Sequence, residues 1–215
     1  METATIPLDF TNADQVVFVV EDDESVRQSL VTLFRSVRLR AQAYATATEF
    51  LDSACPAGPS CLVLDVRLPG ISGLDLQAEM VARDLRLPIV FISGHGTVPM
   101  TVKAMKAGAI EFLVKPLDEE ALLKAVRQGL WDDWNARKTR DELEDCLASY
   151  HRLTERERAL FQHIASGRLI KESAAEFGIS EVTVKAYRRR LLEKMGVPTI
   201  VELARVAERL NLPKV

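Results

Sequence analysis

The chain has 215 residues, of which 47% are hydrophobic and 27% are charged, so it is long enough for two small domains with ordinary buried cores. This composition excludes a disordered chain and an array of repeats. No apolar stretch approaches the roughly 20 residues that cross a bilayer. The N-terminus also lacks a basic segment followed by an apolar run, so we expect a cytoplasmic protein with no membrane partner.

Charge is distributed unevenly along the chain. Residues 1–150 hold 15 Lys and Arg against 23 Asp and Glu, a net charge of −8, whereas residues 151–215 hold 13 against 8, a net charge of +5. An acidic domain followed by a basic one indicates a nucleic-acid or other anionic partner for the C-terminal part. A charged face that merely contacts water is the alternative.

Cysteine and histidine are too few and too scattered for a metal site. The three cysteines, Cys55, Cys61 and Cys146, fit no ligand spacing, and the histidines lie at positions 95, 151 and 163. We therefore expect reduced thiols that pack in cores, and neither a zinc site nor a cysteine nucleophile.

The N-terminal two-thirds alternates short apolar runs with amphipathic stretches. The runs cover residues 16–20, 61–64, 88–92 and 109–114, with a weaker one around 41–45. Helical spacing follows in 26–37, after Thr46 (which forms a capping box with Glu49), in 74–83, in 97–107 and in 118–130. Five strand–helix repeats with strands that are apolar throughout predict a parallel sheet covered on both faces.

Polar side chains stand where these runs end. The first run, VVFVV, leads directly into Glu21, Asp22 and Asp23, the next ends at Asp65, and the last two end at Ser93 and Lys115. The carboxyl ends of parallel strands form one rim, which is where open α/β sheets bind ligands. Carboxylates there suit Mg²⁺, and Asp65 is then placed to attack a phosphoryl group. The alternative for residues 21–24 is a solvated turn and helix start.

The segments VVEDD, LVLDVRLPGISG, FISGHG and EFLVKP make residues 14–131 resemble a response-regulator receiver domain. The resemblance implies an α/β flavodoxin-like fold with a five-stranded parallel sheet in the order 2-1-3-4-5, and a cis bond between Lys115 and Pro116. It also implies the following roles: phosphoacceptor Asp65; Mg²⁺ ligands Glu21 (through water), Asp22, Asp65 and the carbonyl of Arg67; phosphate-sensing Ser93 and Lys115; and switch aromatic Phe112. Glu21 stands where aspartate is commoner in the family.

Residues 132–150 are charged, lack Gly and Pro, and predict a helical linker. An apolar stripe runs through it and its flanks, at Leu130, Trp134, Leu143, Leu147 and Tyr150. The stripe is either a self-association seam of coiled-coil type or a surface that packs on its own domain.

The C-terminal part reads as four helices, in which Thr154 with Glu157 and Thr199 with Glu202 form capping boxes and Ser180 is an N-cap. The middle two helices have helix-turn-helix spacing, and the later of these two, which begins after Ser180, is basic on one face. Residues 151–215 resemble a LuxR-type DNA-binding domain, whose groove-facing positions correspond to Lys185, Ala186 and Arg189 and whose backbone contacts correspond to Thr183 and Arg188. Ile170, Ser173 and Tyr187 depart from the usual residues. The last helix carries an apolar stripe, at Ile200, Leu203, Ala207 and Leu210, that is either a dimer face or core.

A receiver followed by this domain defines the FixJ/NarL class of response regulator. The resemblance implies a non-enzymatic two-component transcriptional regulator, which accepts a phosphoryl group on Asp65 from a sensor histidine kinase with Mg²⁺ as cofactor. Phosphorylation then promotes a homodimer that binds double-stranded DNA and contacts RNA polymerase. One alternative is a phosphorylation-independent DNA-binding regulator. Another is an aspartyl-phosphate hydrolase, which Arg67 disfavours because it occupies the general-acid position of such enzymes.

Overall fold

The computed structural model describes residues 15–53 and 58–212, which fall into two compact units, one up to Arg137 and the other from Lys138 onward. Cys55 and the predicted ends of the two domains, at residues 14 and 215, lie outside the described residues. The other two cysteines, Cys61 and Cys146, are free thiols, as predicted. Among the helices that the structure describes, none has the length and apolar character to cross a membrane.

The first unit is built on a five-stranded sheet in the order β2-β1-β3-β4-β5, and every pair of neighbours is parallel. The strands are β1 (Val16–Val20), β2 (Arg40–Tyr44), β3 (Ser60–Asp65), β4 (Ile89–Ser93) and β5 (Glu111–Val114). All residues of β1, β3 and β4 are buried, which accounts for their continuous apolar character. The predicted fold class and strand order are therefore confirmed.

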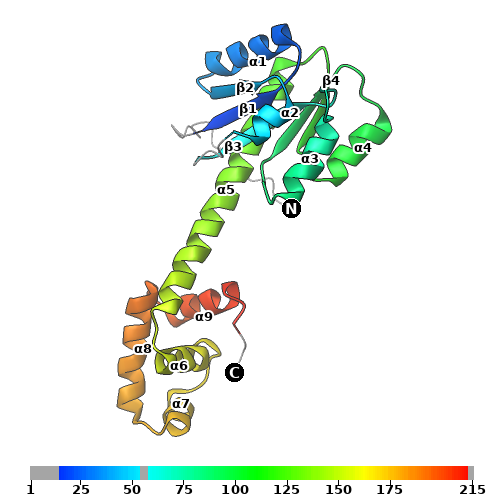
Figure 1. Ribbon diagram of the computed structural model, residues 1–215. Helices are drawn as coiled ribbons and strands as arrows, with labels where there is room; N and C mark the ends of the chain where they lie inside the picture. Colours follow the sequence, from blue (N-terminus) through cyan, green and yellow to red (C-terminus); the bar gives the residue numbers. More distant parts are fainter. Residues whose placement is uncertain (1–14, 54–57, 213–215) are drawn as a thin grey trace. The chain divides into compact units, whose positions relative to one another are not determined.

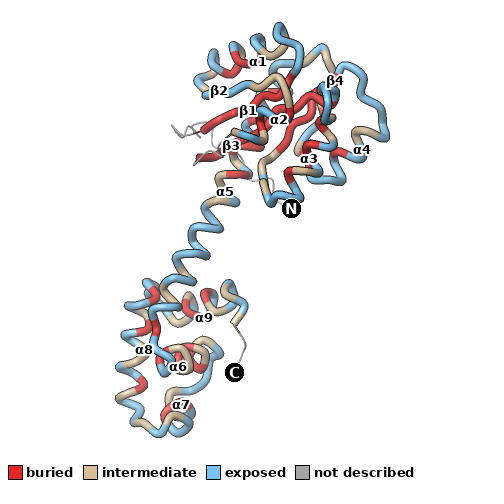
Figure 2. Tube along the Cα trace, viewed as in Figure 1, coloured by how far each residue is buried: buried red, intermediate tan, exposed pale blue. Residues whose placement is uncertain are grey.

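Helices cover both faces of this sheet (Figure 1). On one face α1 (Glu24–Ser36) and α5 (Glu119–His151) pack against alternate strand residues, with Phe34 and Leu122 at the centre. On the other face lie α2 (Ala47–Leu51), α3 (Gly73–Ala82) and α4 (Val98–Lys106), whose apolar residues form one core cluster with Phe18 and Phe91. Figure 2 shows the buried strands between exposed outer helix surfaces.

β2 is the edge strand and differs from the others. The residues of β2 are exposed or only partly buried. The strand at the opposite edge, β5, contributes the buried residue Phe112 to the core. An edge strand next to solvent needs fewer apolar residues, which is why the sequence signal around residues 41–45 was weak. Its bounds differ by one residue from the predicted run.

The long helix α5 confirms that residues 132–150 continue as helix. The ends of the apolar stripe pack on their own units, because Leu130 lies in the core of the first unit and Tyr150 against that of the second. Trp134 stacks on Trp131 with ring centroids 5.0 Å apart. Leu143 and Leu147 are 40% and 42% exposed, so self-association is an open alternative at these two positions.

The second unit contains α6 (Glu155–Ala165), α7 (Ile170–Phe177), α8 (Glu181–Met195) and α9 (Ile200–Arg209) around the end of α5. Thr154 and Glu157 form the predicted capping box, and Thr199 and Ser180 cap α9 and α8. The tight turn between α7 and α8 is made by Gly178, whose φ of 61° places it in the left-handed region. The α9 stripe belongs to the core: Leu203 is fully buried, and the other members, Ile200, Ala207 and Leu210, pack against the same cluster.

Candidate functional site

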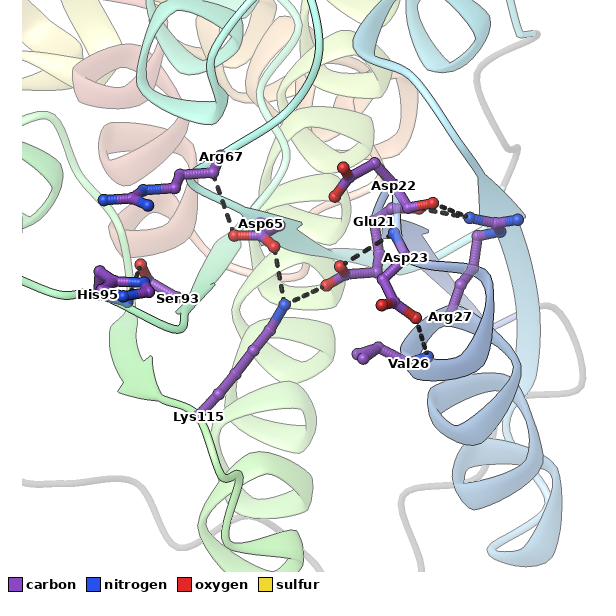
Figure 3. A network of polar contacts seen from close by, with 10 residues as sticks. All are labelled: Glu21, Asp22, Asp23, Val26, Arg27, Asp65, Arg67, Ser93, His95 and Lys115. Carbon is purple, nitrogen blue, oxygen red and sulfur yellow. Dashed lines mark hydrogen bonds and ion pairs between the residues drawn. The ribbon is translucent and has the colours of Figure 1, made fainter.

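The carboxyl ends of β1, β3, β4 and β5 bring the predicted polar side chains to one pocket (Figure 3). Glu21 follows β1, Asp65 and Ser93 end β3 and β4, and Lys115 follows β5. Each of these strands is held in register by its parallel neighbours, so the rim is fixed by the core below it. The peptide bond between Lys115 and Pro116 is cis, as expected.

Lys115 bridges two carboxylates in this pocket. Its Nζ lies 2.7 Å from Oε2 of Glu21 and 2.7 Å from Oδ2 of Asp65, and both carboxylates are almost completely buried. One carboxylate oxygen from each of Glu21, Asp22 and Asp65 lies within 4.8 Å of the others. The predicted convergence of the three acids and the lysine is found.

Burial and the contact between Glu21 and Lys115 shift the pKa values of both groups. Burial raises the pKa of Glu21, and the charge of Asp65 adds to this rise against the opposing effect of the Lys115 hydrogen bond. Burial alone lowers the pKa of Lys115, but its hydrogen bonds to Asp65 and Glu21 outweigh that effect, so its pKa is raised. Lys115 is therefore held in its charged form. Its hydrogen bond in turn favours the ionised form of the buried Glu21 carboxylate, against the effect of burial.

The turn that carries the acids is held by two further groups. Asp23 caps α1 by accepting a hydrogen bond from the Val26 N–H at 3.0 Å. Arg27 donates from Nη1 to the carbonyl oxygens of Glu21 at 2.8 Å and Asp22 at 2.9 Å. Sequence reasoning missed Arg27. Its position in the first turns of a helix that follows the acids is the only signal it carries.

Asp65 is oriented through both of its oxygens. Oδ1 accepts a hydrogen bond from the backbone N–H of Arg67 at 3.1 Å, and Oδ2 accepts one from Nζ of Lys115 at 2.7 Å. The role predicted for the carbonyl of Arg67, as a metal ligand, stays a prediction. Ser93 ends the neighbouring strand β4 and is fully buried, and its Oγ accepts a hydrogen bond from the His95 N–H at 3.2 Å.

Phe112, the predicted switch aromatic, lies in the core in this structure. Its side chain stacks on Phe91 with ring centroids 6.1 Å apart, and the residue is 9% exposed. Gly96 makes room for it, because a Cβ at that position would lie 2.8 Å from Cε1 of Phe112. A side chain at position 96 would therefore compete with the inward position of the ring.

The acidic cluster is typical of a Mg²⁺ site. It offers only carboxylate oxygens, the hard ligands that Mg²⁺ prefers, and Asp22 is exposed so that waters can complete the coordination. Three carboxylates so close together repel one another, and Lys115 offsets only part of that charge. The residues present therefore fit a divalent cation.

In the second unit, α8 presents a basic outer face. Val184, Leu191 and Met195 are buried as predicted. Lys185, Ala186 and Arg189 are exposed, and the Arg189 side chain is 84% exposed with an ion pair to Glu193 at 2.9 Å. This is the face on which DNA contacts were predicted.

Of the two other predicted DNA-contacting residues, one is partly buried and the other is hydrogen-bonded within its own helix cap. Arg188 is partly buried, and it lines a hollow of about 720 Å³ with Lys185 and Arg189. The Thr183 hydroxyl lies 2.8 Å from Oγ of Ser180 at the start of α8. Thr183 thus contributes to the helix cap, and its backbone-contacting role stays a prediction.

The residues that depart from the family pattern in and near α7 are accommodated within the core. Ile170 packs at its edge, Tyr187 is partly buried against it, and Ser173 is fully buried with no hydrogen-bond partner for its hydroxyl among the described residues. α7 itself forms with the expected turn to α8.

Two family models match the chain. One, described as "Response regulator receiver domain", matches residues 17–127, and the other, "Bacterial regulatory proteins, luxR family", matches residues 151–207. The first match runs from β1 into the first turns of α5, and the second runs from the last residue of α5 into α9.

Relatives match over nearly the whole chain. Nodulation protein W of Bradyrhizobium diazoefficiens is 45% identical over 92% of this chain and 87% of its own length. Response regulator protein TmoT of Ectopseudomonas mendocina is 42% identical over 92% and 90%. Among solved structures, the response regulator StyR is 43% identical with a TM-score of 0.82, over 91% of this chain and 99% of that one. Full-length FixJ of B. japonicum is 32% identical with a TM-score of 0.55, over 91% and 97%.

Proposed function

This chain belongs to the two-component response regulators that join a receiver domain to a LuxR-type DNA-binding domain, and on that premise we propose that Asp65 is its phosphoacceptor. A sensor histidine kinase supplies the phosphoryl group. An Asp65 carboxylate oxygen bonds to phosphorus as the bond from phosphorus to the kinase histidine nitrogen breaks. The proposal follows the predicted division into a receiver (14–131), a linker (132–150) and a DNA-binding domain (151–215).

The observation that carries the proposal is the pair of 2.7 Å contacts that Lys115 makes with Asp65 and Glu21, inside a cluster of three carboxylates. A positive charge next to the attacking oxygen attracts the incoming phosphoryl oxygens. Ser93 ends the strand next to the one that Asp65 ends, and it is proposed to supply a hydroxyl donor to the same oxygens. Lys115 and Ser93 are therefore the proposed phosphate-sensing groups, with Phe112 as the aromatic that follows their movement.

Glu21, Asp22, Asp65 and the carbonyl of Arg67 are the proposed holders of Mg²⁺, with Glu21 acting through a water molecule. The ion supplies charge neutralisation for phosphoryl transfer when it is bound. The chain's own contribution is to keep the carboxylates together, through Lys115 on one side and the Arg27 hydrogen bonds on the other.

Phosphorylation is proposed to favour a homodimer in which two α8 helices read double-stranded DNA. The basic face of α8, with Lys185 and Arg189 exposed, suits phosphate contacts for affinity and base contacts for specificity. Such a regulator acts in the cytoplasm, where DNA and RNA polymerase are its further partners. Added phosphoryl charge of about −1.5 to −2 is the signal that Lys115 and Ser93 answer.

The alternatives have less support. A hydrolase of the haloacid-dehalogenase type, which forms an aspartyl phosphate, needs a general acid two residues after the nucleophile, where this chain has Arg67. A degenerate receiver that never accepts phosphate does not require the close contacts of Lys115 with Glu21 and Asp65.

Intact-mass measurement tests the phosphoacceptor directly. The full chain, incubated with Mg²⁺ and acetyl phosphate, gains one phosphoryl group and shifts towards a dimer on size exclusion, and Asp65→Asn does neither. A wild-type protein that stays unlabelled with both acetyl phosphate and a cognate kinase contradicts the proposal in favour of the phosphorylation-independent regulator.

DNA binding is tested on Arg189. If Arg189 reads a base, Arg189→Ala weakens binding to a selected DNA site by about 1–3 kcal/mol and relaxes the preference at one position. An unchanged affinity and footprint removes Arg189 from the recognition surface.

A further inference from the structure

One stripe on the outer face of α8 carries two apolar residues and two cations in alternation. Val182, Lys185, Ala186 and Arg189 are spaced i, i+3, i+4 and i+7, which places them on one stripe of the helix, and all four are exposed. Val182 is 75% exposed, against 0% for Val184 two residues later. The stripe therefore alternates apolar and cationic groups in the order valine, lysine, alanine, arginine.

Neither packing nor helix formation accounts for Val182. Val182 is mostly exposed and is not a member of the core cluster that holds Val184, and a β-branched residue in an exposed first turn has no advantage in helix propensity. The polar neighbour Thr183 directs its hydroxyl to Oγ of Ser180, so that hydroxyl is already engaged in the cap. The group that the first turn of α8 offers on this stripe is thus the pair of Val182 methyl groups.

We propose that Val182, together with Ala186, reads thymine methyl groups in the major groove, while Lys185 and Arg189 read guanine. This rests on the proposed DNA-binding function and specifies the DNA sequence class that the site takes. Apolar side chains contact the C5-methyl group of thymine, and Lys or Arg donate to O6 and N7 of guanine. The N-terminal residues of a recognition helix are those that reach the base edges, and Val182 is the second residue of α8.

The spacing along the helix sets the spacing on DNA. Four residues rise about 6 Å along a helix axis, which is close to two base-pair steps of about 3.4 Å each. Val182 and Ala186 therefore reach thymines about two steps apart, with the cations reaching guanines displaced along the same groove. A mixed T- and G-containing half-site is expected, and a run of G·C pairs alone is not.

Selection from random DNA followed by removal of single methyl groups tests the proposal. The full chain, treated with Mg²⁺ and acetyl phosphate, is used to select binding sites from random duplexes. Each selected thymine is then replaced by deoxyuridine, which removes only the C5-methyl group. Affinities are measured for the wild type, Val182→Ala and Val201→Ala. Val201 is the matched control, because it is an exposed valine (64%) on α9, away from the recognition helix.

At one thymine position, deoxyuridine is expected to weaken wild-type binding by about fourfold, the factor that corresponds to burying one methyl group. In Val182→Ala this loss falls below about twofold, and in Val201→Ala it keeps its wild-type size. Selected sites without thymine sensitivity, or an equal loss in the wild type and Val182→Ala, overturn the thymine reading and leave DNA binding intact. A wild-type protein that selects no DNA at all overturns the proposed function itself, and the inference with it.

Discussion

The close approach of α5 to β3 makes a specific prediction for Gly129. A Cβ at this position would lie 2.6 Å from Sγ of Cys61 and 3.1 Å from Cδ1 of Ile110. Cys61 is fully buried in the middle of the sheet, so the sulfur cannot move out towards solvent. Overpacking of this kind costs about 1–3 kcal/mol. Alanine inside a helix gains about 1 kcal/mol over glycine. The difference predicts that Gly129→Ala lowers the free energy of unfolding of the receiver by up to about 2 kcal/mol.

The same substitution should change sign once the sulfur is removed. In a Cys61→Ala background the nearest obstacle is gone, and Ile110 is the end of a flexible side chain, so Gly129→Ala should raise the free energy of unfolding by up to about 1 kcal/mol. Both tryptophans, Trp131 and Trp134, lie on α5 within the first unit, so fluorescence during urea unfolding reports on this domain. A double-mutant cycle compares the two backgrounds. Equal effects of Gly129→Ala in both would refute the steric argument.

Three further predictions concern charge and metal binding. Burial raises the pKa of Glu21 above its unfolded value, so the ionised carboxylate lowers the free energy of unfolding at neutral pH. Glu21→Gln should therefore stabilise the metal-free receiver by about 1 kcal/mol. It should also reduce the rise in melting temperature on addition of Mg²⁺, because one carboxylate of the cluster is lost. A lower melting temperature in this variant would contradict the sign. Arg27→Met should weaken Mg²⁺ binding in calorimetry by about tenfold, with Arg27→Lys between it and the wild type, because the turn bearing two of the acids loses its hydrogen bonds. Equal Mg²⁺ affinities in the three proteins would remove Arg27 from the site. The Lys194 hydrogen bonds, with those of Thr154, lower the pKa of Glu157, so their contribution to stability is present above the unfolded pKa of about 4.5 and is lost as pH falls through the folded value. Glu157→Gln should therefore flatten the acid limb of DNA-binding-domain stability, measured by circular dichroism, and the exposed control Glu155→Gln should not.

The strands and the pocket were predictable because their signals are local. Continuous apolar runs such as 16–20 and 61–64 identify buried parallel strands, and the rule that ligands bind at the carboxyl ends then assembles Asp65, Ser93 and Lys115 without any knowledge of distances. The predicted helices 74–83 and 97–107 differ by one residue at each end from α3 and α4. Helix ends depend on caps rather than on periodicity, which explains such differences.

The groups that sequence reasoning missed bind backbone atoms or distant residues. Arg27 donates to two carbonyl groups, and Asp133 accepts the Ser60 N–H at 2.8 Å while pairing with Arg137 at 2.7 Å. Every residue has a carbonyl and nearly every one has an N–H, so the backbone partners of Arg27 and Asp133 leave no pattern in the sequence. Glu157 was predicted as a capping residue, but its ion pair with Lys194 joins positions 37 apart in the chain, and only the fold brings them together.

The bridging position of Lys115 has a consequence for charge balance in the pocket. Three carboxylates and one ammonium carry a formal charge of −2, which one divalent cation balances. The lysine therefore sets the valence for which the pocket is balanced. A monovalent cation leaves it negative, and replacing Lys115 by a neutral residue leaves a deficit that a single divalent ion cannot make up. A phosphoryl group on Asp65, as proposed above, would add negative charge to this balanced site and attract the Lys115 ammonium towards the phosphoryl oxygens.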